Sequence, residues 1–209
     1  MSRPADGRTA RRGGIDPAPS PGYGGAATAP ARPRPTSGEH MSITGRLDGG
    51  DLVLRRTVPA SRTRIWQHLT DPDHLATWYG AYSGDPASGV VEVTMTAEPG
   101  EPSTSPWSIH ACERERLLTV SSALGDQVWK LSLELEGGSD GAGGAAGDLT
   151  HLALRHHDVP ADMVEHIGPG WEWYLDRLVG AVTGSRIPGM DVWDAEYMSR
   201  APEYAALAS

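Results

Sequence analysis

The side chains with the most potential for chemistry lie between residues 156 and 166. Histidine and aspartate are common ligands of metal ions, and this stretch holds His156, His157, Asp158, Asp162 and His166. However, adjacent residues of a strand point to opposite faces of a sheet, so His156 and His157 are not expected to reach one ion. The chain has no His-Glu-x-x-His or comparable paired spacing. The sequence therefore predicts no metal site, and it indicates no cofactor.

A covalent nucleophile is not indicated either. Cys112 is the only cysteine, which excludes an intramolecular disulfide and a cysteine-rich zinc site. Strand parity groups it with Ser108 and His110, opposite Trp107, so an outer position and a poor thiolate are expected. There is no Gly-x-Ser-x-Gly motif, and the glycine-rich segment 137–148 lacks the Lys-Ser/Thr of a phosphate-binding loop. We assign no catalytic residue.

His156 is the polar residue with the clearest inward placement. It shares the strand parity of Leu152 and Leu154, so its side chain is expected among apolar neighbours. There it could donate a hydrogen bond to a ligand or, with a suitable pKa, act as a base. The alternative is a histidine at a strand end that bonds to backbone or water.

Alternating apolar residues dominate the middle of the chain. The clearest case is 128–136, where Trp129, Leu131, Leu133 and Leu135 share one face and charged or polar residues share the other. Similar patterns predict strands at 51–58, 90–95, 106–113, 117–122 and 149–157. Between the first two, Ser61 can cap a helix to about Leu69, and a second short helix follows the turn at Asp71.

One long helical pattern closes this region. Trp171, Leu175 and Leu178 recur at spacings of four and three, with Pro169 placed in the first turn and Gly184 at the stop. The segment 160–170 before it is expected to be a linker with room for a helical turn of its own. A single amphipathic helix after many strands must bury its stripe against a sheet. The sequence thus predicts an α+β fold with an antiparallel sheet.

Composition sets the remaining limits. Residues 1–40 hold six arginines against three acidic residues, whereas the rest holds 12 basic and 24 acidic residues, so the folded part is expected not to bind nucleic acid.

No apolar run reaches the roughly 20 residues of a membrane span, and no secretory signal is evident, so a cytoplasmic protein is expected. Seven prolines and seven glycines within residues 1–40 predict a disordered leader over 1–45, and we hypothesise that translation starts at Met41.

Several stretches resemble the START-like, or SRPBCC (Bet v 1-like), superfamily, and within it bacterial homologues of the heat shock protein 90 ATPase activator. They are Val58–Trp66, Leu69–Trp78, Leu149–His156, and Gly170 and Trp171 with Leu175 and Leu178. The resemblance implies a domain over 50–183 with a helix-grip fold: a curved antiparallel sheet around a long C-terminal helix, with two short helices after the first strand. It also implies an internal cavity. The extension 184–209, with Trp193, Tyr197 and Tyr204, is expected to pack on the domain or on a second subunit of a homodimer.

The implied cavity suggests two functions of different classes. The first is a binding protein without catalysis, which holds a small apolar ligand or modulates a protein partner as the chaperone activators do. The second is an enzyme similar to polyketide cyclases or dehydratases, for which His156, Tyr174 and Glu172 are the available ionisable groups. The expected ligand-binding residues, which could instead fill a solid core, are Trp78, Trp107, Trp129, Leu133, Leu152, His156, Met163, Trp171 and Leu175.

Overall fold

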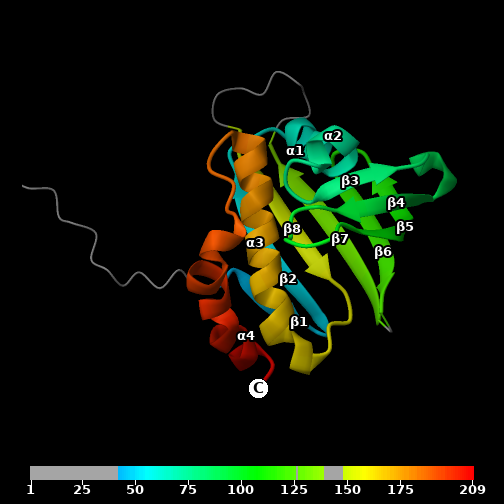
Figure 1. Ribbon diagram of the computed structural model, residues 1–209. Coiled ribbons are helices and arrows are strands. Elements are labelled where there is room, and N and C mark those ends of the chain that lie inside the picture. The colour runs from blue at the N-terminus through cyan, green and yellow to red at the C-terminus, as the bar shows by residue number, and fades with distance from the viewer. Residues whose placement is uncertain (1–41, 126, 139–147) are drawn as a thin grey trace, which may run out of the picture. The chain divides into compact units, whose positions relative to one another are not determined.

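The computed structural model describes residues 42–125, 127–138 and 148–209 (Figure 1). They contain an eight-stranded antiparallel sheet with the strand order β1-β2-β8-β7-β6-β5-β4-β3. The strands are β1 (Gly45–Asp48), β2 (Asp51–Val58), β3 (Gly80–Ser83), β4 (Val90–Met95), β5 (Ser103–Glu113), β6 (Leu117–Leu124), β7 (Gln127–Gly137) and β8 (Thr150–His156). The strands predicted from alternation are confirmed. The short strands β1 and β3 were not predicted, because four residues show too little alternation.

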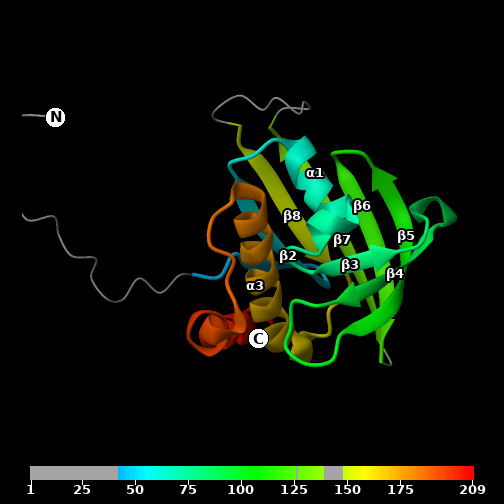
Figure 2. The same cartoon turned by 45° about the horizontal axis from the view of Figure 1, so that its top comes forward.

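Four α-helices accompany the sheet in the described part of the chain: α1 (Arg62–Thr70), α2 (Pro72–Leu75), α3 (Val164–Thr183) and α4 (Ala201–Leu207). Figures 1 and 2 show α3 lying along the concave side of the curved sheet. In chain order, α1 and α2 follow β2 and precede β3. This is the predicted helix-grip arrangement, and the two short helices lie where they were expected.

The starts of α1 and α2 follow from their capping residues. The Ser61 side chain accepts a hydrogen bond from the Arg64 N–H, and the Asp71 carboxylate accepts from the N–H groups of Asp73 and His74. Both caps satisfy donors that the first helical turn leaves without intrahelical partners. The predicted starts of both helices are confirmed.

Helix α3 begins earlier than predicted. The structure places its first residue at Val164, so Pro169 lies inside the helix and the predicted linker shrinks to Pro160–Met163, where a short helical turn over Ala161–Met163 is present. Proline lacks the N–H that would bond to the Glu165 carbonyl, a local cost that usually ends a helix. Here Val164 and Ile167 are both buried in the core. Their burial extends the apolar face past the proline and offsets that cost.

Two predictions fall on residues outside the described ranges. The leader was predicted over 1–45, and its first 41 residues are not described. Its last two residues belong to the fold, because the Thr44 N–H donates to Glu172 and Gly45 begins β1. The glycine-rich connection predicted at 137–148 also lies mostly outside the described residues, although Gly137 and Thr150 are paired in the sheet.

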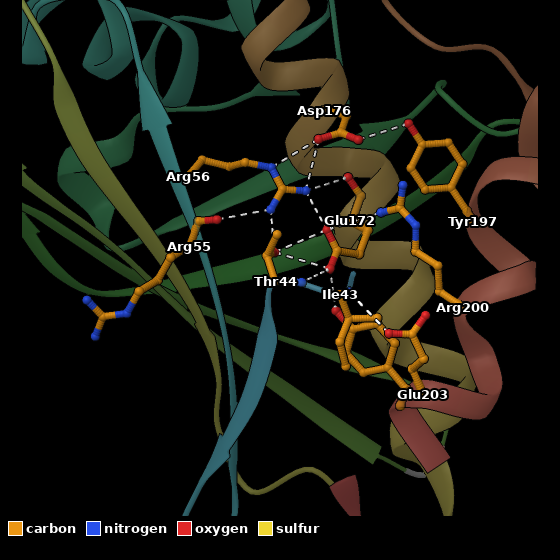
Figure 3. Close-up of polar contacts among 10 residues, drawn as sticks. Ile43, Thr44, Arg55, Arg56, Glu172, Asp176, Tyr197, Arg200 and Glu203 are labelled. Atoms are coloured by element: carbon orange, nitrogen blue, oxygen red, sulfur yellow. Dashed lines mark hydrogen bonds and ion pairs between the residues drawn. The ribbon is translucent and has the colours of Figure 1, made fainter. Parts of the chain in front are cut away.

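A buried cluster of charges joins α3 to segments that precede it and follow it in the sequence (Figure 3). The Glu172 carboxylate is fully buried and lies 2.5 Å from Arg56 of β2 and 3.4 Å from Arg200. It also accepts hydrogen bonds from the Thr44 N–H and the Tyr204 hydroxyl, both at 2.7 Å. Burial by itself raises the pKa of Glu172, but Arg56, Thr44 and Tyr204 outweigh it and hold this pKa below the ordinary value.

The C-terminal segment reaches this cluster through a close contact of Tyr204. This side chain is fully buried, and its ring lies against Gly45 of β1 and Gly168 of α3. A Cβ atom at either glycine would lie within 2.5 Å of the ring, so only glycine leaves room for the tyrosine. Trp193 also packs on Trp173, and the Tyr197 hydroxyl donates to Asp176, so residues 193–207 pack on α3 and β1 of the same chain.

We predict that Glu172→Gln lowers the free energy of unfolding by about 3 kcal/mol, because it removes the carboxylate that pairs with the buried Arg200 and one of the two that hold the partly buried Arg56. Urea denaturation at pH 7 measures the change. Glu165→Gln is the matched control, since it removes a glutamate of the same helix whose side chain is 45% exposed, and it should change stability by less than about 0.5 kcal/mol. Equal effects of the two substitutions would contradict the prediction.

Candidate functional site

An apolar cavity of about 150 Å³ lies between the α1–α2 segment, the sheet and α3. Strands β4 to β8 form its floor, and no Asp, Glu, Lys or Arg belongs to its described lining. Pro86 and Cys112 are exposed and mark where the lining meets solvent. The lining residues are Leu69, Thr70, Leu75, Trp78, Tyr79, Tyr82, Pro86, Val91, Val93, Trp107, Ile109, Cys112, Leu118, Val120, Leu131, Leu133, Leu154 and Trp171.

Most polar atoms of the lining are used to hold its walls in place. The Trp78 indole N–H donates to the His68 carbonyl at 2.9 Å, and the Tyr82 hydroxyl donates to the Thr70 carbonyl at 2.7 Å. On the other side, Arg177 of α3 donates to the Trp78 carbonyl at 2.8 Å. These bonds fix the segment after α1 over the cavity without placing a charge inside it.

Cys112 faces the cavity because β5 contains an irregularity. Ile109 pairs with Val120 of β6, whereas Ala111 pairs with the next residue, Thr119, so His110 is an extra residue in β5. Such a β-bulge inverts the alternation of side chains beyond it. Cys112 therefore joins Ile109 on the cavity face, and the outer position predicted from strand parity is wrong. No feature of the local sequence marks the bulge.

The structure brings together four of the nine predicted ligand-binding residues. Trp78, Trp107, Leu133 and Trp171 belong to the cavity lining. The other five lie outside the lining: Leu152 and Leu175 are fully packed in the core, Met163 packs at the core edge, and Trp129 and His156 form an aromatic group behind Trp171. Ligand binding by any of the nine stays a prediction.

His156 is buried and engaged with aromatic neighbours. Its Nδ1 accepts a hydrogen bond from the Trp171 indole N–H at 3.0 Å, so its proton is on Nε2, and its ring lies 4.7 Å from that of Trp129. Burial, followed by the nearby His157, lowers the pKa of His156 to about 4. The ring is therefore neutral at pH 7 and positions Trp171, which lines the cavity.

A Ser-His-Asp arrangement occurs on the opposite face of the sheet. His157 lies 2.8 Å from the Ser132 hydroxyl and 3.3 Å from the Asp51 carboxylate. Ser132 is only 4% exposed, and its strand is paired on both sides, so its neighbouring N–H groups are not free to form an oxyanion hole. These contacts therefore link β7, the end of β8 and the start of β2 through polar side chains, which is a structural role.

The described residues offer neither a metal site nor a membrane-spanning helix. No group of three or more His, Cys, Asp or Glu side chains could hold a metal ion in the part of the chain that the structure describes. Within the same residues, no helix is long and apolar enough to cross a membrane.

The helix-grip fold and its cavity define a START-like domain. The chain matches the family described as Activator of Hsp90 ATPase homolog 1-like protein over residues 59–183, and it belongs to this family. No match is found among the curated proteins.

Solved structures support the same fold. The crystal structure of CalU16 from Micromonospora echinospora has 24% sequence identity and a TM-score of 0.59, covering 80% of this chain and 96% of that one. A protein of Bordetella parapertussis encoded by gene BPP1335 has 20% identity and a TM-score of 0.57, covering 80% and 88%. A protein of Arthrobacter aurescens has 15% identity and a TM-score of 0.56, covering 68% and 92%. At these identities the likeness concerns the fold.

We predict that the His156 ring titrates near pH 4 and carries its proton on Nε2 at pH 7. A histidine whose folded pKa lies below the ordinary 6.5 stabilises the fold fully above pH 6.5 and progressively less as the pH falls toward 4. Long-range proton–nitrogen NMR spectra measure both the midpoint and the tautomer, and His156→Gln identifies the signal. A midpoint near 6.5 would contradict the burial described here.

Proposed function

We propose that this protein binds a small uncharged apolar molecule in the cavity beneath α1 and α2. The observation that carries the proposal is a cavity of about 150 Å³ whose lining contains no charged side chain and reaches solvent at Pro86 and Cys112. Ligand sites in proteins are concave and mostly apolar, and a cavity of this volume can hold a benzene-sized molecule.

The stability that such a cavity costs supports a role in binding. An apolar space of this size leaves its lining without the packing contacts of a filled core, and that loss costs stability. Larger side chains at partly buried lining positions such as Val120 and Leu118 would remove that cost. A ligand that fills the cavity recovers it each time it binds.

The catalytic alternative receives no support from the positions of its candidate groups. None of His156, Glu172 and Tyr174 belongs to the cavity lining. His156 accepts from Trp171, Glu172 is held in the charge cluster, and the Tyr174 hydroxyl donates to Glu98 at 2.8 Å. The proposed role is therefore binding without catalysis. The shape and the apolar character of the cavity then determine which compounds bind.

We predict that saturating toluene raises the melting temperature of the protein by about 5 °C or more, because a ligand at 100 times its Kd adds about 2.7 kcal/mol to stability. Val120→Trp should remove this shift by filling the cavity. The control is Val128→Trp, because Val128 is 70% exposed on the neighbouring strand β7 and should leave the shift intact. A wild-type protein without a shift, or a shift retained in Val120→Trp, would refute the proposal.

A second candidate function follows from membership of the family. The family description names an activator of the Hsp90 ATPase, and modulation of such a protein partner would use the outer surface of the domain. This candidate predicts that saturating amounts of the protein change the ATPase rate of a purified Hsp90 at least twofold, in wild type and Val120→Trp alike. An unchanged rate would remove it, and the cavity proposal would stand.

A further inference from the structure

We infer that the ligand of this cavity carries a hydrogen-bond acceptor oxygen, and that the indole N–H of Trp107 binds it. The inference rests on the proposed function and deepens it, because it assigns a polar feature to a ligand that the apolar lining alone leaves undefined. The ligand class is then a ring-sized, uncharged carbonyl or ether compound.

Trp107 differs from the other tryptophans of the lining in the state of its donor. Its side chain is 4% exposed, and its Nε1 is buried with no hydrogen-bond partner among the described residues. By contrast, the indole N–H of Trp78 donates to His68, and that of Trp171 donates to His156. Of the three tryptophans in the described lining, Trp107 is therefore the one whose indole N–H has no partner.

An unpaired buried donor is unusual enough to require a reason. The great majority of buried polar groups in proteins are hydrogen-bonded, and each exception costs about 1–3 kcal/mol. The ring of Tyr79 approaches Trp107 edge to face, with centroids 6.3 Å apart. An N–H···π contact at such a distance is at best a weak substitute for an oxygen acceptor. Both residues line the cavity, and the Trp107 Nε1 atom is closed off from it in this structure, so a small shift of the indole ring on binding would bring the N–H to an acceptor inside the cavity.

The surroundings favour a ligand oxygen over a buried water molecule. A buried water needs two to four polar partners. Near Trp107 the lining is mostly aliphatic and aromatic. The hydroxyls of Thr70 and Tyr82 already donate to backbone carbonyls, which leaves the Tyr79 hydroxyl as the one other hydroxyl of the described lining. A carbonyl or ether oxygen needs only the one donor that Trp107 supplies, since the rest of the molecule is apolar. An anion is disfavoured, because no cationic side chain belongs to the described lining.

The test compares two probes of nearly equal shape, acetophenone and ethylbenzene, of which only acetophenone has an acceptor. Titration calorimetry gives Kd for each probe with the full-length protein. We expect Trp107→Phe to weaken acetophenone about fivefold and to change ethylbenzene less than twofold, because one neutral hydrogen bond is lost. Trp78→Phe is the matched control: its N–H is already used, so both probes should change by the same factor.

Occupation of the cavity itself is read from Cys112, the only thiol of the chain. Both probes should slow the alkylation of Cys112 by iodoacetamide, and mass spectrometry measures the rate of this reaction. If Trp107→Phe does not fold, the wild-type NMR signal of the Trp107 indole N–H replaces the variant. Acetophenone should shift this signal downfield, whereas ethylbenzene should not.

The outcomes separate the two proposals. If both probes bind and protect Cys112 but Trp107→Phe weakens them equally, the hydrogen-bond inference is wrong and cavity binding stands. If acetophenone binds and the NMR signal of the Trp107 N–H does not shift, the hydrogen-bond inference is likewise wrong and cavity binding stands. If neither probe binds or protects the thiol in the wild type, cavity binding and the inference are both wrong.

Discussion

The carboxylate of Glu172 holds together segments that are far apart in the chain. It binds Thr44 before β1, Arg56 in β2, and Arg200 and Tyr204 near the C-terminus. Removing a carboxylate from water costs several kcal/mol, which the molecule offsets by surrounding it with two guanidinium groups, the N–H and hydroxyl of Thr44, and the hydroxyl of Tyr204. Each of these partners is useful only if α3 lies at one rotation and one height on the sheet. The cluster thereby adds directional contacts between α3 and the rest of the chain to the apolar packing between helix and sheet.

That fixed position determines where space remains between helix and sheet. Along β2 and β8, residues such as Leu54 and Leu152 are fully buried in the core and do not border the cavity. Farther across the sheet, toward β4, β5 and β6, α3 no longer fills the concave side, and the α1–α2 segment covers it instead. The cavity lies in this region. Charge at one edge of the sheet and an apolar space at the other are thus two results of the same placement of α3.

The fold could be predicted because its signals are local and repeated. Alternation such as that of Leu131, Leu133 and Leu135, and the stripe of Leu175 and Leu178, recur over many residues and survive single exceptions. The site was only partly predictable. Trp107 and Trp171 could be placed on inner faces, but which inward side chains border open space depends on the tilt of α3. That tilt is set by contacts between residues more than 100 positions apart, such as Arg56 and Glu172, which no local pattern encodes.

The extra residue His110 has a consequence for comparing this chain with its relatives. A homologue whose corresponding strand runs without a bulge needs one residue fewer between the positions that pair with Val120 and Thr119. An alignment without a gap at this point would match inward residues of one protein to outward residues of the other as far as the end of β5. Ligand-contact positions transferred from such a homologue would then fall on Ala111 or Glu113, and the cysteine that borders the cavity would be overlooked.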